Sequence, residues 1–395
     1  MNISAKIILK SGKDQSVRRY HPWIFSGAIK KMHGEPQEGD LVEVYDNKDE
    51  LLAIGHYAIG SIAIRVLTFD QEEVDFEFWK KRIQNAFNLR KMLGLHYQND
   101  NNTYRLVHAE GDLLPGLIID YYDGTAVVQL HSVGMFKELN NIVEALKEVI
   151  GDDLKAIYNK SEATLPFKAE TGVENGYVYG ESNIEWALEY GNKFKVNWED
   201  GQKTGFFIDQ RENRKLLGQY SKGRKVLNMF GYTGGFSVYA MKEGAELVHS
   251  EDSSKLAIQL TNENIDLNFE DTSRHDAFAV EAFEYMKDIK DKYDMIVLDP
   301  PAFAKHQKVL HNALQGYKRL NQRALEQIAP GGILFTFSCS QAVSKENFRK
   351  SVFVAAANAN RKVRILHQLT QPADHPVSIY HPEGEYLKGL VLYVE

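Results

Sequence analysis

The chain contains a single thiol and a carboxylate that follow two separate apolar segments. Asp299 comes directly after Met295–Leu298, and Cys339 closely follows Ile333–Phe337. In an open α/β sheet ligands bind at the carboxyl ends of the strands, so both side chains would lie at the ligand-binding edge. A thiolate there can act as a nucleophile, and a carboxyl group can hydrogen-bond a polar substrate. The alternatives are a small buried hydrophobe for Cys339 and a helix cap or turn for Asp299.

A glycine-rich turn indicates a ligand site on the same sheet. The strand predicted over Val226–Phe230 runs into a turn that contains Gly231, Gly234 and Gly235. Glycine there lets the backbone turn sharply and approach a ligand. The spacing differs from G-x-G-x-x-G and no G-K-[ST] follows, so a dinucleotide or a nucleoside triphosphate is disfavoured. A plain tight turn is the alternative.

Acidic residues follow the next two predicted strands. Asp252 comes after the apolar residues that begin at Leu247, about 20 residues beyond the first glycine, where a carboxylate can accept hydrogen bonds from ribose hydroxyls. Glu251 is the neighbour in reserve, and the alternative is that Asp252 or Ser253 caps the next helix. Glu281 follows a strand predicted over residues 278–280, and there it could lie near the adenine of a bound nucleoside. An exposed helix residue is an equal alternative.

Three segments position these residues. Residues 1–72 read as short strands separated by turns, which favours a small β-barrel. Residues 73–190 mix helix and strand and predict a central α+β domain. Residues 191–395 repeat strand, turn and helix, with strands expected at 226–230, 247–249, 295–298 and 333–337. This pattern predicts a doubly wound, Rossmann-like, largely parallel sheet of the α/β class.

Composition narrows the class of protein. The 395 residues carry 47 Lys and Arg against 54 Asp and Glu, a net charge of −7, which argues against a protein that coats nucleic acid non-specifically. No apolar run has membrane-spanning length, the N-terminus lacks a signal-peptide pattern, and one cysteine excludes disulfides within the chain and multi-cysteine zinc sites. We therefore expect a cytoplasmic protein without a metal.

The first 35 residues are locally basic, and aromatic residues lie among the charges. This composition suits contact with phosphates and bases, although a solvated face beside a small aromatic core is the alternative. The candidate RNA-binding residues are Arg18, Arg19, His21 and Trp23.

Several longer strings resemble one family. The strings are Arg18–Gly27, Arg105–Asp123, Gln202–Arg211, Asp374–Pro376 and Pro382–Gly389. Together with the motifs above, they are similar to class I S-adenosylmethionine (SAM)-dependent methyltransferases, and more narrowly to large-subunit (23S) ribosomal RNA cytosine-C5 methyltransferases with an N-terminal PUA domain. The resemblance covers nearly the whole chain.

The resemblance implies a role for each candidate residue. Cys339 would attack C6 of a cytosine, and Asp299 would hydrogen-bond the N3/N4 edge of the ring. Many RNA cytosine-C5 enzymes carry a second cysteine in the loop that here reads Asp299–Phe303, so the base that removes the C5 proton stays unidentified. SAM would be held by Gln202, Thr204, Gly205, Asn228, Phe230, Gly231, Thr233, Gly234, Gly235, Asp252, Glu281, Asp299 and Pro300.

Two other functions remain open from the sequence. One is an RNA guanine or base-amino methyltransferase on the same fold, which would not need Cys339. The other is a non-catalytic RNA-binding factor in ribosome assembly. The expected partner is ribosomal RNA, either free or within the large subunit or its precursor. The oligomeric state is open, with a homodimer as one option.

Overall fold

The computed structural model describes residues 3–97, 100–165, 172–304 and 307–395, which form two compact units. The first unit comprises Met1–Ala187, Val196–Ile208 and Ala373–Gly384. The second comprises Leu188–Lys195, Asp209–Pro372 and Glu385–Glu395. The chain crosses repeatedly between the units, so neither is a continuous segment. The limits 72/73 and 190/191 stay predictions.

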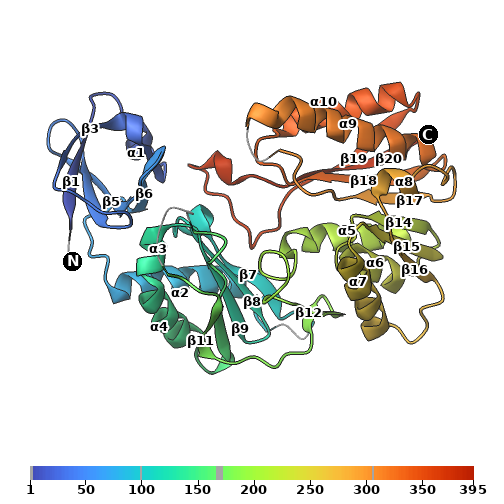
Figure 1. Cartoon of the computed structure of the whole chain (residues 1–395), viewed down its shortest axis with the longest axis horizontal. Coiled ribbons are helices and arrows are strands. Elements are labelled where there is room, and N and C mark those ends of the chain that lie inside the picture. Colours follow the sequence, from blue (N-terminus) through green and yellow to red (C-terminus); the bar gives the residue numbers. More distant parts are fainter. Residues whose placement is uncertain (1–2, 98–99, 166–171, 305–306) are drawn as a thin grey trace. The chain divides into compact units, whose positions relative to one another are not determined.

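The first unit begins with a six-stranded sheet in the order β2-β6-β5-β4-β1-β3 (Figure 1). Only β1 and β4 pair in parallel, and the other pairs are antiparallel. Alternate residues of β1 and β4 are buried, which is the pattern of a sheet with one face on a core. The elements are β1 (Ala5–Leu9), α1 (Gln15–Arg18), β2 (Trp23–Phe25), β3 (Ile29–His33), β4 (Leu41–Tyr45), β5 (Leu51–Tyr57) and β6 (Ile62–Thr68).

A five-stranded sheet in the order β11-β10-β9-β8-β7 follows in the same unit. Its strands pack with α2 and α4 around one apolar core. Asp123 and Gly124 make the hairpin turn between β8 and β9, and the two tyrosines before the turn belong to β8. The elements are α2 (Phe76–Met92), β7 (Thr103–His108), β8 (Leu117–Tyr122), β9 (Thr125–Leu130), α3 (Val133–Lys137), α4 (Leu139–Ile150), β10 (Ala156–Asn159) and β11 (Gly176–Gly180).

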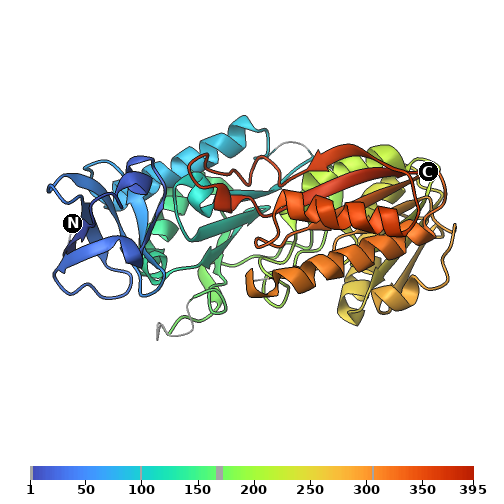
Figure 2. The same ribbon diagram turned by 90° about the horizontal axis from the view of Figure 1, so that it is seen from above.

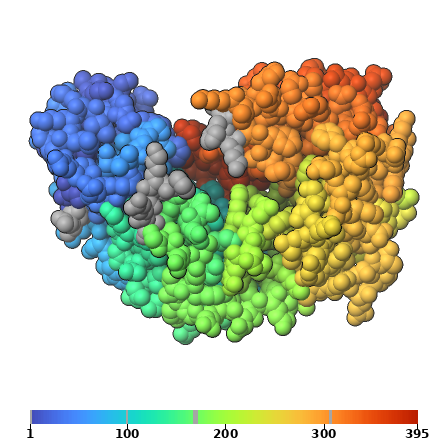
Figure 3. Space-filling view, in the orientation of Figure 1, coloured from blue at the N-terminus to red at the C-terminus, as the bar shows by residue number. Residues whose placement is uncertain are grey.

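The second unit is built on a seven-stranded sheet in the order β16-β15-β14-β17-β18-β20-β19. The first five strands are parallel, whereas β20 is antiparallel to β18 and β19. Helices α9 and α10 cover one face, and α5, α6 and α7 cover the other (Figures 1 and 2). This arrangement confirms the doubly wound fold, and residues of this unit form a packed body in the space-filling view (Figure 3).

The bounds in this part of the chain are as follows. A short pair, β12 (Ala187–Glu189) and β13 (Asn192–Phe194), precedes the sheet. The strands are β14 (Lys225–Met229), β15 (Leu247–Asp252), β16 (His275–Ala279), β17 (Met295–Leu298), β18 (Gly332–Ser338), β19 (Val363–Leu369) and β20 (Lys388–Val394). The helices are α5 (Arg211–Ser221), α6 (Gly235–Lys242), α7 (Lys255–Asn268), α8 (Ala282–Tyr285), α9 (Leu310–Gln327) and α10 (Lys345–Asn358).

Two of the strands differ from the prediction in a way that concerns the acidic residues. β15 continues through Asp252 because Glu251 and Asp252 pair with β16, and this pairing outweighs their low strand propensity. β16 begins at His275 and ends at Ala279, so Glu281 is the N-cap residue of α8. Neither Asp252 nor Ser253 is the N-cap of α7, since the Ser254 side chain accepts from the Ala257 N–H at 3.3 Å.

Candidate active site

Cys339 and Asp299 follow the carboxyl ends of neighbouring parallel strands. Asp299 is the residue after β17 and Cys339 is the residue after β18. The two strands pair in parallel, with Leu298 opposite Thr336. The structure therefore brings the predicted thiol and carboxyl to the same edge of the sheet. Cys339 is partly exposed, whereas the serines on both sides of it are buried.

The loops that carry the two groups are tied together. The Ala304 N–H, in the loop after Asp299, donates to Ser340 Oγ at 3.2 Å. The hydroxyl of Tyr317 on α9 lies 3.0 Å from the same oxygen, and the Ser340 N–H donates to Ser338 Oγ at 3.3 Å. These contacts fix the backbone on both sides of Cys339, so the thiol is held at a defined position relative to the Asp299 loop.

Asp299 lies in a polar cluster at the start of α5. Gln210 Nε2 donates to Asp299 Oδ2 at 3.0 Å, and Asn213 Nδ2 donates to Gln210 Oε1 at 2.6 Å, which fixes the orientation of the Gln210 amide. Burial raises the pKa of Asp299 to about 7, the negative charge of Asp209 adds to the rise, and the Gln210 hydrogen bond opposes it. Near neutral pH the carboxyl can therefore hold a proton and donate a hydrogen bond.

The turn after β14 has an uncommon backbone. Phe230, Tyr232 and Gly234 have positive φ angles of 60°, 47° and 75°. Two of the three carry side chains, and such residues cost about 1–3 kcal/mol each and concentrate at ligand sites. The Gly231 N–H donates to the Glu251 carbonyl at 2.9 Å, and the Gly234 N–H donates to the Gly231 carbonyl at 2.8 Å. The turn is thus fixed against β15.

The acidic residues at the end of β15 face this turn. Asp252 Oδ2 accepts from the Tyr232 N–H at 3.1 Å, and Asp252 Oδ1 accepts from the Ser254 N–H at 2.9 Å. A carboxylate has about four acceptor positions, so Asp252 can still receive two hydroxyl groups. Burial raises the pKa of Glu251 to about 8, and the charges of Asp252 and Glu281 add to the rise. The charges of Asp252 and Glu281 therefore both act on Glu251.

Asn228 provides a direct test of whether a polar cofactor fits. Its Nδ2 donates to Ser237 Oγ at 2.9 Å, but its Oδ1 is buried and has no hydrogen-bond partner among the described residues. The residue is 1% exposed. A buried acceptor without a donor costs about 1–3 kcal/mol, which an ammonium or hydroxyl donor from a ligand would recover. The residues at this turn therefore fit SAM, whose methionine part carries an ammonium group.

The remaining cofactor candidates occupy different places. Thr233 is buried, and its carbonyl accepts from Asn264 Nδ2 at 2.8 Å. Pro300 is buried in the loop after Asp299. Gln202, Thr204 and Gly205 belong to the first unit, where Thr204 Oγ1 donates to Asp120 Oδ2 at 2.6 Å. Their part in SAM binding stays a prediction.

The candidate RNA residues lie in the first unit, and Arg18 has strong local partners. Its Nε donates to Asp14 Oδ2 at 2.7 Å, and its Nη2 donates to Asp46 Oδ2 at 2.9 Å and to Glu50 Oε2 at 2.7 Å. A guanidinium engaged by three carboxylates would have to exchange one of them to bind phosphate. Arg18 therefore has a structural role in this sheet.

The other candidate RNA residues differ in exposure. Trp23 Nε1 donates to Glu110 Oε1 at 2.8 Å, and the Trp23 N–H donates to His21 Nδ1 at 3.1 Å. Arg19 is exposed. Tyr20, the aromatic residue next to Arg19 in the sequence, is 51% exposed. Arg19 and Tyr20 are therefore open to a ligand, as is Phe25, which is 48% exposed.

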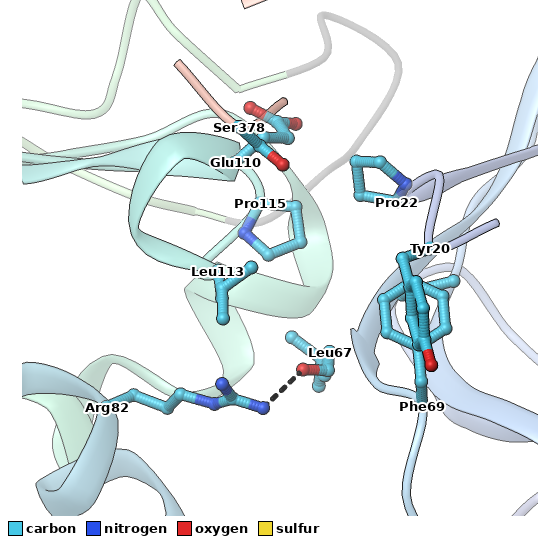
Figure 4. Close-up of a pocket in the computed structure, with 10 residues that line it drawn as sticks. Tyr20, Pro22, Leu67, Phe69, Arg82, Glu110, Leu113, Pro115 and Ser378 are labelled. Carbon is cyan, nitrogen blue, oxygen red and sulfur yellow. Dashed lines mark hydrogen bonds between the residues drawn. The ribbon is translucent and has the colours of Figure 1, made fainter. Parts of the chain in front are cut away.

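A pocket in the first unit lies beside Tyr20. It is lined by apolar residues that include Tyr20, Phe69, Leu113 and Pro115, with Arg82 at one wall (Figure 4). Arg82 Nη2 donates to a backbone carbonyl of β6 at 3.2 Å. None of the residues predicted for catalysis or for SAM lines this pocket. Within the described part of the chain, no cluster of three or more His, Cys, Asp or Glu side chains could hold a metal ion.

Solved structures show the class of the fold. A protein from Streptococcus mutans that is assigned to the SAM-dependent methyltransferases has a TM-score of 0.84, with 98% of this chain and 99% of that chain covered. A second solved chain, in complex with SAH, has a TM-score of 0.85 over the same shares. The identities are 22% and 23%, so the likeness shows the fold alone. That fold is the Rossmann-like methyltransferase fold.

Sequence relatives narrow the class to a family. The model of the S-adenosylmethionine-dependent methyltransferase family matches residues 104–380, and that of a PUA-like domain matches residues 7–69. Proteins named ribosomal RNA large subunit methyltransferase I from Tolumonas auensis and Aeromonas hydrophila are 41% and 42% identical over 398 and 400 residues, covering 99% of each chain. The chain belongs to the SAM-dependent methyltransferase family, which confirms the predicted family, cofactor and enzyme class.

Sequence reasoning missed several residues of the site. Gln210 lies within the string Gln202–Arg211, but nothing in that string indicates contact with Asp299. Lys388 on β20 and Tyr317 on α9 both contact the loop that follows Cys339. In the sequence, Lys388 had one signal, since a lysine opens an otherwise apolar strand.

Proposed function

We propose that this enzyme methylates C5 of a cytosine in large-subunit ribosomal RNA through a bond between Cys339 and C6. The observation that carries the proposal is the position of Cys339 and Asp299 at the ends of adjacent parallel strands, with their loops joined by the Ala304–Ser340 hydrogen bond. The names of the relatives supply ribosomal RNA as the substrate. We also infer that the enzyme acts in the cytoplasm, on free RNA or on the large subunit or its precursor.

The chemistry follows from the two groups. The Cys339 thiolate adds to C6, which ends the aromaticity of the ring and makes C5 nucleophilic. Asp299, in its protonated form, donates a hydrogen bond to N3 and stabilises the charge that develops as sulfur adds. When bound, SAM supplies the methyl group. Loss of the C5 proton to a base or to water then lets the sulfur leave and restores the C5–C6 double bond.

SAM itself would be held by the turn after β14 and by the acids of β15. Asn228 Oδ1 is the buried acceptor that a ligand ammonium can satisfy. Asp252 has acceptor capacity for the ribose hydroxyls, and Glu281 begins α8 beside the next strand. The Gly231 N–H, which donates to the Glu251 carbonyl at 2.9 Å, would hold the backbone of this turn against β15.

RNA would contact the six-stranded sheet with which the first unit begins. Arg19 and Tyr20 are exposed, and so are Lys30 and Lys31 on the edge strand β3. Lysines attract phosphates without reading sequence, whereas an exposed tyrosine can stack on an unpaired base. The target cytosine must leave its stack to reach a thiol at a sheet edge.

The experiment combines labelled SAM, unmodified ribosomal RNA and mass spectrometry of the digested nucleosides. We expect 5-methylcytidine from the native enzyme and none from Cys339→Ser. Calorimetry with SAM serves as the control that Cys339→Ser still folds and binds the cofactor. Labelled N-methylguanosine, or full methylation by Cys339→Ser, would place the enzyme in the base-amino class. SAM binding without methylation of any RNA would favour the assembly factor.

A further inference from the structure

Lys388 is a buried lysine beside the candidate nucleophile. It is the first residue of β20 and pairs with Ser338, the residue before Cys339. It is only 5% exposed. Lysine is almost never fully buried without a partner, because an ammonium loses its hydration inside a protein. The position of this lysine therefore requires an explanation.

The hydrogen bonds of Lys388 go to the loop that follows Cys339. Its Nζ donates to the Ser340 carbonyl at 2.5 Å and to the Val343 carbonyl at 2.6 Å. Both acceptors are neutral. No carboxylate of the described residues forms an ion pair with this Nζ, and the nearby Glu385 pairs with Lys345 at 2.8 Å on the surface. The ammonium is thus held in place, but its charge is not neutralised.

The charged and titratable groups around Lys388 come from several elements. Cys339 follows β18 and Tyr317 lies on α9, while Lys345 at the start of α10 and Glu385 form an exposed ion pair. Burial lowers the pKa of Lys388 to about 8; attraction to Cys339 and to Glu385 opposes the fall, and repulsion by Lys345 adds to it. Attraction to Cys339 therefore favours the Lys388 ammonium more than attraction to Glu385 does, and Cys339 is the group of this set that can supply a negative charge from the adjoining strand end.

We propose that Lys388 is the positioning residue that keeps Cys339 in the thiolate form and holds its loop at the sheet edge. The S–H bond of Cys339 breaks, the proton goes to solvent, and the ammonium of Lys388 keeps all of its protons. The Cys339 thiolate then balances the charge of the Lys388 ammonium until its sulfur bonds to the substrate. This inference rests on the proposed nucleophilic role of Cys339.

The test uses the single cysteine of the full-length enzyme. Alkylation by iodoacetamide requires the thiolate, so its rate against pH reports the midpoint of Cys339 ionisation without any RNA or SAM. In the native enzyme we expect the midpoint below about 8.5, the ordinary value of a free cysteine. In Lys388→Met we expect it to rise by about one unit, which lowers the rate at pH 7 about tenfold. Lys388→Arg should restore most of the shift.

The matched control is Lys345→Met, which removes an exposed lysine close to the same loop and should leave the midpoint unchanged. A native midpoint at or above about 8.5 overturns the proposal even if Lys388→Met does not fold. An unshifted midpoint in a folded Lys388→Met also overturns it. If Cys339→Ser still methylates cytosine, the proposed nucleophilic role of Cys339 is wrong. The alkylation assay measures only the ionisation of Cys339, so the two failures can be distinguished.

Discussion

Replacing Gly234 by alanine tests whether the turn after β14 is built for a ligand. Gly234 has a φ of +75°, and a Cβ atom there would lie 2.7 Å from Thr261 Cγ2. Thr261 Oγ1 also donates to the Tyr232 carbonyl at 3.0 Å, so a displaced threonine would move the turn. The left-handed backbone costs a non-glycine residue about 1 kcal/mol, and overpacking adds about 1–3 kcal/mol. We expect Gly234→Ala to destabilise the protein by about 2–4 kcal/mol.

Gly223 gives a matched control in the same unit. Its φ is +69°, but a Cβ atom there would meet nothing within 4 Å. Gly223→Ala should therefore cost only the backbone term, about 1 kcal/mol. For a domain of about 150–250 residues, 1 kcal/mol moves the melting temperature by about 2–4 °C. Thermal melts should then show a drop of about 4–16 °C for Gly234→Ala and about 2–4 °C for the control.

Measuring SAM affinity shows whether the turn after β14 binds the cofactor or is only a tight turn. Calorimetry should show at least about tenfold weaker SAM binding for Gly234→Ala, which corresponds to about 1.4 kcal/mol, and unchanged binding for Gly223→Ala. Equal melting temperatures for the two variants would refute the steric argument. Native SAM affinity in a destabilised Gly234→Ala would refute the placement of the cofactor at this turn.

Two further predictions concern buried charge in the second unit. Arg214 donates to both oxygens of Glu189 at 2.8 and 2.6 Å, so Glu189→Gln removes the charge from a buried ion pair and should destabilise the protein by about 3–5 kcal/mol. Glu263→Gln, in an exposed ion pair, should cost at most about 1 kcal/mol in the same melts. The pKa of Asp299 in the folded protein, about 7, lies above the ordinary value of 3.8 for an aspartate. The contribution of its protonated form to stability is therefore complete below pH 3.8 and is lost as the pH rises to 7. Asp299→Asn should therefore gain melting temperature relative to the native protein between pH 5 and pH 8, and an unchanged difference would contradict the raised pKa.

The parallel sheet could be predicted because its strands are short apolar runs that end in polar residues. β17 begins and ends where the apolar run Met295–Leu298 does. β15 was predicted too short because its last residues are polar, and hydrogen-bond pairing with β16 rather than hydrophobicity extends it through Asp252. Local composition thus indicates where a buried strand lies, but partner strands decide where it stops.

The candidate site was only partly predictable, for a related reason. The sequence predicts Asp299, Cys339 and the glycines because each is a characteristic residue type that closely follows a predicted strand. Gln210 reaches Asp299 across 89 positions of the chain, and Lys388 reaches the Ser340 carbonyl across 48. Contacts of that range depend on the order of strands in the sheet, which no local pattern encodes. The polar surroundings of a reactive group are therefore visible only in the folded chain.

The segment Ala373–Gly384 limits how this protein can be divided for experiments. It belongs to the first unit, although the residues on both sides of it belong to the second. Asp374 Oδ2 accepts from the Arg105 N–H at 3.0 Å, and Arg90 donates to the Asp374 carbonyl at 2.7 Å. A truncated catalytic fragment that starts near residue 191 would carry this segment without its anchoring arginines. A split enzyme made by co-expressing two fragments would have to rebuild those hydrogen bonds between separate polypeptides.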